Sequence, residues 1–145
     1  MAESQARISL EEFERLCAES APFLRHYDFR TEDIGVGSAR VRLPYDERHI
    51  RPGGTVSGPA MMALADFCMW AAVLGAIGNV PLAVTTSLNI NFLRKPDNTD
   101  ILCHARLLKQ GRRLAVGDMW LHAENDGEPC AHATATYSIP PLPEN

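Results

Sequence analysis

The chain has 145 residues, of which 46% are apolar and 22% are charged, and its formal net charge is −4. This length fits one domain of ordinary globular composition, large enough to bury about two thirds of its unfolded surface. Nucleic-acid binding usually requires a basic face, so the acidic balance argues against nucleic acid as a partner.

The start of the chain and its cysteines indicate where the protein works. The first residues contain no basic and then apolar stretch ending in a small-residue cleavage site, so the sequence predicts no signal peptide and a cytoplasmic protein. The four cysteines are widely spaced and form no CxxC pair: Cys17, Cys68, Cys103 and Cys130. In such a setting we expect reduced and mostly buried thiols.

The first predicted elements are a helix and a hairpin. Ser9 and Glu12 form a capping box, which predicts a helix that follows with its apolar residues on one face. Pro22 should end this helix or begin a short second turn. A strand over about residues 27–34 and a Gly35–Gly37 turn lead to a second strand, where buried and exposed residues alternate over 39–43. A loop of turn residues then covers 44–54.

The long helix is the dominant element of the sequence. Gly58 and Pro59 open it, Ser57 is a candidate N-cap, and residues 60–76 are apolar on every side, which predicts a helix buried all round. A membrane span is the alternative reading of this stretch. Asp66 near its middle would cost about 2.5–3.5 kcal/mol in a bilayer, and the breakers after Leu74 also favour a core helix.

Four strand-like runs follow: 84–92, 101–108, 114–124 and 129–139. The Asp126-Gly127 pair is a strong hairpin signal between the last two. The proline-rich tail, 140–145, should not continue the sheet. The order of elements predicts one α+β domain over 1–145, with a core over about 22–139 and one long helix laid across an antiparallel sheet.

Asp66 is the residue most suited to chemistry. It is the only formally charged side chain between Arg51 and Arg94, and it lies in an otherwise apolar helix. An unpaired buried carboxylate is costly, so we expect Asp66 to have a specific task. The sequence suggests a general base or a nucleophile, while a structural hydrogen-bonding role is the alternative.

The start of the helix offers a second reactive feature. The Gly58 amide and the free N–H groups beside it present a positive end to a developing oxyanion. Gly58 and Asp66 are eight residues apart, which is about 12 Å along a helix. Both cannot reach one carbonyl from one chain, so we expect an obligate symmetric dimer in which Gly58 of one subunit meets Asp66 of the other.

The motif around these residues resembles that of the hotdog-fold thioesterases of the PaaI (phenylacetyl-CoA) type. The resemblance rests on Gly54–Asp66, the strand 84–92 and the Gly111 turn, and it covers about 22–139. The family has a Gly-x-x-His-Gly-Gly run, an acidic residue nine positions after the His, and a polar residue early in the next strand. Asp66 keeps that spacing from Ser57, and Thr85 has the strand position. Ser57 replaces the His, Pro59 the second Gly, and Arg51 lies where relatives often have Asn.

The resemblance implies a hotdog fold, in which an antiparallel sheet wraps around one long helix, with a short N-terminal helix in addition. It implies an acyl-CoA thioesterase, and the apolar helix suits aryl or medium-chain acyl groups. Asp66 would be the base or nucleophile, the Gly58 amide would polarise the carbonyl, and Thr85 would hold the water or the carboxylate. Ser57 would assist or only cap the helix. The family places its sites at dimer interfaces and often pairs dimers into tetramers. No metal or organic cofactor is expected, since coenzyme A is part of the substrate.

Exposed cations are the candidates for binding the phosphates of coenzyme A, because phosphate favours Arg and Lys in loops. Besides Arg51, the sequence offers Arg94 and Lys95 at a strand end, and Lys109, Arg112 and Arg113 at a turn. Ordinary solvated turn charges are the alternative for each of them.

Three other readings stay open. Loss of the motif His could mark a protein that binds acyl-CoA without hydrolysing it, as a sensor or carrier. Hotdog dehydratases and hydratases rely on a His paired with an acidic residue, and no His lies on the long helix here. His122 and His132 lie on successive strands, but ordinary hydrogen bonds explain them better than a metal site does.

Overall fold

The computed structural model describes residues 5–142. Its order is α1 (Leu10–Ser20), the 3-10 helix η1 (Pro22–His26), β1 (Arg30–Gly35), β2 (Ser38–Leu43), the 3-10 helix η2 (Glu47–His49), β3 (Ile50–Arg51) and β4 (Thr55–Val56). Then follow α2 (Gly58–Ile77), β5 (Val84–Phe92), β6 (Ile101–Gln110), β7 (Leu114–Ala123) and β8 (Pro129–Ser138).

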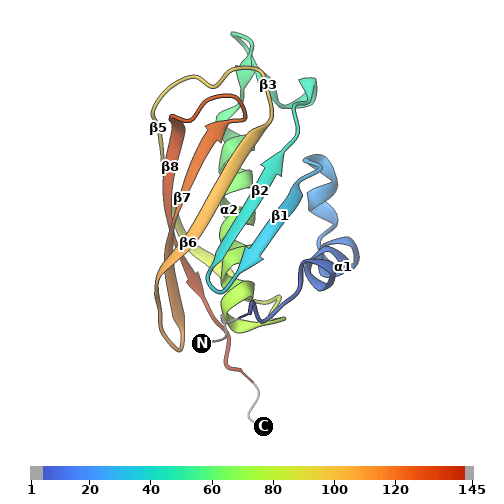
Figure 1. Ribbon diagram of the computed structural model, residues 1–145, viewed down its shortest axis with the longest axis vertical. Helices are drawn as coiled ribbons and strands as arrows, with labels where there is room; N and C mark the ends of the chain where they lie inside the picture. The colour runs from blue at the N-terminus through green and yellow to red at the C-terminus, as the bar shows by residue number, and fades with distance from the viewer. Residues whose placement is uncertain (1–4, 143–145) are drawn as a thin grey trace.

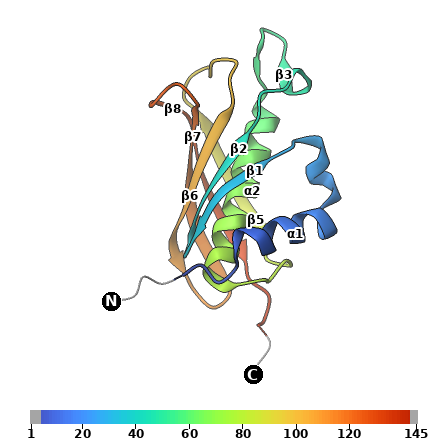
Figure 2. The same ribbon diagram turned by 45° about the vertical axis from the view of Figure 1, so that its right-hand side comes forward.

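Six strands form one antiparallel sheet in the order β1-β2-β6-β7-β8-β5, and β3 pairs with β4 in a separate short ribbon. Helix α2 lies along the inner face of this sheet, and α1 packs at the side of β1 (Figures 1 and 2). This arrangement confirms the predicted hotdog fold, in which the sheet wraps around one central helix and a short helix precedes it.

The two helices begin where their caps predict. The Ser9 hydroxyl accepts a hydrogen bond from the Glu12 amide at 3.0 Å, and the Ser57 hydroxyl accepts one from the Ala60 amide at 3.2 Å. Each cap satisfies one of the amide groups that the first turn of a helix leaves free. The predicted capping box is therefore confirmed in its Ser9 half.

Small residues allow α2 to lie very close to the sheet. A Cβ atom added at Gly75 would come within 2.1 Å of the Gly35 carbonyl oxygen and 2.8 Å of the Ile34 side chain. On β8, alternate inward positions hold alanines. The close packing of α2 against the sheet therefore depends on small residues at these positions as well as on the larger side chains of the core.

The prediction that α2 is buried on all sides is wrong for one stripe. Met62 is 40% exposed, Pro59 is exposed, and Ala63, Asp66 and Trp70 are half-buried. These positions recur at helical spacing, so one face of α2 is left uncovered within a single chain. The rest of α2 is core, which accounts for a helix long and apolar enough to cross a bilayer.

Two further boundaries differ from the sequence prediction. The first strand begins at Arg30 and not near Tyr27, because residues 27–29 leave η1 through a positive backbone φ of 56° at Asp28. The loop over 44–54 contains η2 and the strand β3, which turn patterns alone do not predict.

Candidate active site

The side chain of Asp66 is held by two hydroxyl groups. Thr85, at the start of β5, donates to Asp66 Oδ1 at 2.6 Å, and Tyr137, near the end of β8, donates to the same oxygen at 2.7 Å. The Tyr137 hydroxyl also lies 2.9 Å from the Asp66 main-chain oxygen. Thr85 and Tyr137 are paired in the register of β5 and β8, so the sheet itself brings both hydroxyls to α2.

The second oxygen of the carboxylate is free. Within residues 5–142, Asp66 Oδ2 accepts no hydrogen bond, and it is not among the buried polar atoms that lack a partner. One oxygen is therefore fixed, while the other has no partner among these residues and is not fully buried. A carboxylate held in this way can take a proton or attack a carbonyl without first breaking its supporting bonds.

Tyr137 is a reliable donor to this carboxylate. Burial, and secondly the negative charge of Asp66, raise the pKa of Tyr137 well above its usual value of 10. The raised pKa favours the protonated phenol, which is the form that donates to Asp66.

A cavity of about 570 Å³ opens beside Asp66. Its walls come from α2, from the start of β5 and from the segment between α1 and β1, and they are mainly apolar. The lining residues are Ser20, Ala21, Phe23, Tyr27, Ala63, Asp66, Phe67, Trp70, Pro81, Leu82, Ala83, Val84, Thr85 and Tyr137.

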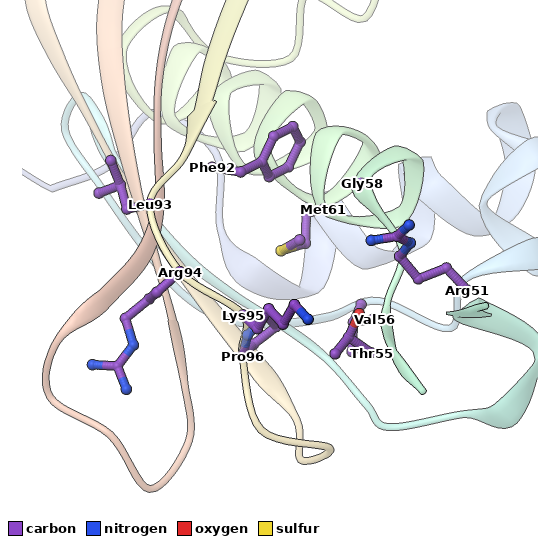
Figure 3. A pocket seen from close by; sticks show the side chains of 10 residues that line it. All are labelled: Arg51, Thr55, Val56, Gly58, Met61, Phe92, Leu93, Arg94, Lys95 and Pro96. Atoms are coloured by element: carbon purple, nitrogen blue, oxygen red, sulfur yellow. The ribbon is translucent and has the colours of Figure 1, made fainter. Parts of the chain in front are cut away.

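A second cavity, of about 440 Å³, lies at the start of α2 (Figure 3). Gly58 lines it, and the Gly58 amide donates to no acceptor within residues 5–142. The Phe92 ring lies against Gly58, so close that an added Cβ would stand 3.3 Å from it. Ser57 caps the helix at this point, so its hydroxyl already accepts a bond from Ala60.

The structure therefore divides the predicted catalytic residues between two places. Asp66 and Thr85 are together at one cavity, and Gly58 and Ser57 are together at the start of α2, about 12 Å away along the helix. Gly58 lines the cavity of about 440 Å³ and Asp66 lines the cavity of about 570 Å³, and neither of these two cavities is lined by both residues.

The predicted substrate-binding cations are also divided. Arg51, Arg94 and Lys95 line the Gly58 cavity, whereas Arg112 and Arg113 line a cavity at the other end of α2, beside Ile77. The Arg94 guanidinium forms ion pairs with Asp126 at 3.2 Å and Glu128 at 3.3 Å. Figure 3 shows it directed away from Gly58, while Arg51 lies beside the helix start.

The histidines and cysteines have structural surroundings. His122 Nδ1 bonds to main-chain oxygens of Ala123 and Asp126, and His132 Nε2 bonds to Asp118 at 3.2 Å. Among residues 5–142, no cluster of three or more His, Cys, Asp or Glu side chains could hold a metal ion. Burial raises the pKa of Cys17 to about 12 and of Cys130 to about 11, so both are unreactive thiols.

Comparison with known families decides the class of protein. Residues 53–130, more than half of the chain, match the family model described as the thioesterase superfamily. The chain belongs to the thioesterase superfamily. The match begins just before α2 and includes the Gly58 and Asp66 positions, so the superfamily assignment rests on the part of the chain that carries both.

Individual relatives agree with this assignment. A candidate thioesterase from Silicibacter sp. TM1040 is 44% identical and superimposes with a TM-score of 0.82, covering 97% of this chain and 96% of that one. A mutant thioesterase from Pseudomonas aeruginosa is 26% identical with a TM-score of 0.80, covering 92% and 95%. A candidate esterase from Thermoplasma acidophilum is 27% identical over 81% of this chain and 87% of its own.

The predicted resemblance to PaaI is borne out at the level of fold. A mutant of the phenylacetic acid degradation protein PaaI from Thermus thermophilus has a TM-score of 0.72, with 24% identity, over 81% of this chain and 98% of its own. Members of the thioesterase superfamily are hydrolytic enzymes, so this chain is an enzyme of the thioesterase or esterase class.

Tyr137 is the site residue that the sequence does not reveal. It lies outside the family-matched residues and appears in the sequence only as one aromatic residue of the last strand. Thr85 is identified by its motif position. Tyr137 is the residue opposite Thr85 on β8, so knowledge of the β5–β8 register would identify it as well.

Proposed function

We propose that the protein is an acyl-CoA thioesterase that hydrolyses the thioester of aryl or medium-chain acyl-CoA, with Asp66 as general base or nucleophile. The observation that carries this proposal is the arrangement of the Asp66 carboxylate, because Thr85 and Tyr137 hold Oδ1, Oδ2 accepts no hydrogen bond among the described residues, and Asp66 lines the apolar cavity. An acyl group in that cavity would place its carbonyl carbon within reach of the free oxygen.

A symmetric dimer would supply the missing oxyanion donor. Strand β5 is an edge of the sheet, nine residues long, and an edge strand of this length is a template for pairing with another chain. The start of β5 touches Asp66 through Thr85, and its end touches Gly58 through Phe92. Antiparallel pairing of two β5 strands about a two-fold axis at Asn89 would set Thr85 opposite the partner's Phe92, because the bulge between Thr85 and Ser87 takes up one residue of β5.

That pairing would bring Asp66 of one subunit toward Gly58 of the other, twice in each dimer. The uncovered stripe of α2, which includes Met62, Ala63 and Asp66, would be covered by the same association. The open edge of β5 and the uncovered stripe of α2 both support the dimer. The edge leaves backbone hydrogen-bonding groups unpaired in one chain, the stripe leaves apolar surface exposed, and a second copy would cover both.

The proposed reaction begins with the thioester carbonyl directed at the Gly58 amide of one subunit. Asp66 of the other subunit takes a proton from a water molecule as that water attacks the carbonyl carbon. The amide then donates to the oxyanion of the tetrahedral intermediate. When the carbon–sulfur bond breaks, the proton held by Asp66 passes to the departing thiolate, which leaves a carboxylic acid and free coenzyme A. Direct attack by Oδ2 is the second route, through an anhydride that water then hydrolyses.

The phosphates of coenzyme A would lie near the start of α2. Arg51 and Lys95 line the Gly58 cavity and form no ion pair within residues 5–142, so both are available to phosphate. Arg94 would have to give up Asp126 and Glu128. Arg112 and Arg113 lie beside Ile77, at the opposite end of α2 from Gly58, so they could contact the phosphates only if coenzyme A approached from that end.

The direct test is thiol release from a panel of acyl-CoA esters, followed with a thiol-reactive dye. We expect wild-type protein to cleave apolar acyl-CoA esters, and Asp66→Asn to lose about 10²–10⁴-fold in kcat because a general base is removed. Asp33→Asn is the matched control, since Asp33 is exposed on β1 and does not line the cavity, and it should keep wild-type rates.

Near-normal turnover by Asp66→Asn would reject the role of Asp66. If no ester is cleaved while several raise the melting temperature, the protein binds acyl-CoA without hydrolysing it, and the proposed activity is wrong.

A further inference from the structure

One wall of the Asp66 cavity is built by the N-terminal segment, residues 10–27. Ser20, Ala21, Phe23 and Tyr27 from this segment line the cavity together with Phe67 and Trp70 of α2. The segment lies outside residues 53–130, so this wall belongs to the chain itself and not to the region that matches the superfamily model.

Most of this wall is held firmly in place. Phe13 of α1 is fully buried, and its ring lies 5.5 Å from that of Phe67 and 5.2 Å from that of Trp70. Such aromatic contacts, buried between two helices, fix α1 against α2. The inner end of the cavity, formed by Phe67 and Trp70, therefore has a set position beside Asp66.

The far end of the segment is held as well. Tyr27 stacks on Phe29 at 5.0 Å and on His49 at 5.5 Å, and His49 Nε2 donates to the His26 carbonyl oxygen at 2.9 Å. His49 also accepts a hydrogen bond from the Ser57 amide through its main-chain oxygen. The same residue thus joins the cavity wall to the cap of α2.

Phe23 differs from the other aromatic residues of the wall. It is 58% exposed, and its ring has no aromatic partner within residues 5–142. It lies in the short helix η1, between the anchored Phe13 and the anchored Tyr27. Leu82 and Val84, which line the cavity from the other side, are 78% and 57% exposed. These three side chains form an apolar rim around an otherwise fixed cavity.

We infer that the N-terminal segment closes the acyl pocket, that the pocket takes uncharged apolar acyl groups, and that Phe23 sets the length of chain it accepts. This inference rests on the proposed thioesterase function and specifies its substrate. Asp66 is the only carboxylate in the lining, and the lining contains no Lys, Arg or His. A terminal carboxylate on the acyl group would lie unpaired among aromatic rings and near the Asp66 charge, which is strongly unfavourable.

The first test measures kcat/KM for straight-chain acyl-CoA esters from butanoyl to palmitoyl, with succinyl-CoA included as a charged short acyl group. Phe23→Ala should raise the ratio of long-chain to short-chain kcat/KM about tenfold, and Phe23→Trp should lower it by a similar factor. Wild-type protein should cleave butanoyl-CoA at least about 100-fold better than succinyl-CoA. Leu108→Ala is the matched control, because Leu108 is similarly exposed on β6 but does not line the cavity, and it should leave the profile unchanged.

A binding measurement locates the acyl group independently of turnover. Trp70 lines the cavity, and the other tryptophan, Trp120, lies on β7 outside it. In the double variant Asp66→Asn, Trp120→Phe, the fluorescence of Trp70 should change on addition of decanoyl-CoA and stay constant with free coenzyme A. In the same background, Phe23→Ala should change the affinity for palmitoyl-CoA more than that for butanoyl-CoA.

The outcomes separate this inference from the function on which it rests. If wild-type protein cleaves acyl-CoA while the Phe23 variants keep its chain-length profile, or Trp70 does not respond, the inference is wrong and the function stands. Efficient cleavage of succinyl-CoA would overturn the assignment of an uncharged substrate. If wild-type protein cleaves no acyl-CoA, the proposed function and this inference both fail.

Discussion

At the scale of single residues, the candidate site depends on the different surroundings of the two carboxylate oxygens of Asp66. Thr85 and Tyr137 both donate to Oδ1 of Asp66, and the proposed mechanism uses the other oxygen, Oδ2, for the reaction. A carboxylate with both oxygens bonded would be well held but slow to accept a proton. A carboxylate with neither oxygen bonded would be costly to keep in an apolar helix.

The raised pKa of Tyr137 leads to a prediction about stability at alkaline pH. Its pKa is raised above the usual value of 10 by burial and by Asp66, so the protonated phenol stabilises the folded state. This stabilisation is fully present below pH about 10 and is lost as the pH rises above it. In an absorbance titration of the phenolate, Tyr137 should ionise only when the protein unfolds.

Tyr137→Phe is the control for that titration. The difference between the wild-type and variant titrations reports Tyr137 alone, and it should appear only at the pH of unfolding. A difference that appears near pH 10 while the protein is still folded would contradict the hydrogen bond from Tyr137 to Asp66.

The sequence predicts this site only in part, for reasons that lie in the register of the strands. Asp66 is visible because a lone charge in an apolar helix is conspicuous, and Thr85 follows from motif spacing. Tyr137 is not visible, because its approach to Asp66 depends on which residues of β5 and β8 are opposite each other. A bulge between Thr85 and Ser87 shifts this register, and strand alternation alone does not place a bulge.

At the scale of elements, α2 and β5 are the parts that position the site. β5 runs from Val84 to Phe92, as its alternating sequence predicts, and α2 begins at Gly58, as its cap predicts. The sequence places the first strand too early, because Tyr27 and Phe29 look like strand residues. In the structure these two rings stack on each other, with a left-handed residue between them.

Gly75 tests how closely α2 must approach the β1–β2 hairpin. An added methyl group would meet the Gly35 carbonyl oxygen at 2.1 Å, so Gly75→Ala must push the helix and hairpin apart. We expect a destabilisation of about 1–3 kcal/mol or more. In thermal unfolding this corresponds to a lower melting temperature by about 2–4 °C for each kcal/mol.

Gly127→Ala provides the comparison, since a methyl group there meets no atom within 4 Å among the residues that the structure describes. It should change the melting temperature little. Equal melting temperatures for the two variants would show that the close approach of α2 to the hairpin is not needed for stability.

At the scale of the whole molecule, one chain holds the parts of the proposed active site at two separate places. Gly58 and Asp66 face different cavities, and the edge strand between them is open. The sequence already requires this separation, because two residues eight positions apart on a helix cannot meet at one carbonyl. It cannot show that β5 touches Gly58 at one end and Asp66 at the other, since that is a property of packing.

The open edge leads to a prediction for the protein in solution. Light scattering coupled to size-exclusion chromatography should give a mass of about 32 kDa or a multiple of it, which is twice the 16.0 kDa of one chain. Specific activity should fall on dilution once the dimer dissociates. A monomer of 16.0 kDa with full activity would contradict the shared site.

The most direct test of the shared site is a mixture of two inactive variants. Gly58→Pro removes the amide donor, and Ser57, with a ψ of 150°, already has the backbone that a following proline requires. Gly58→Ala is its control, because it adds a similar Cβ but keeps the amide, and it should retain most activity.

In a hybrid dimer of Asp66→Asn with Gly58→Pro, one site carries both changes and the other carries neither. After dissociation and reassociation of equal amounts, about half of the dimers are hybrids with one intact site of two, so we predict about a quarter of wild-type activity from parents that have almost none. A mixture no more active than its parents would show that Gly58 and Asp66 do not act across a dimer interface.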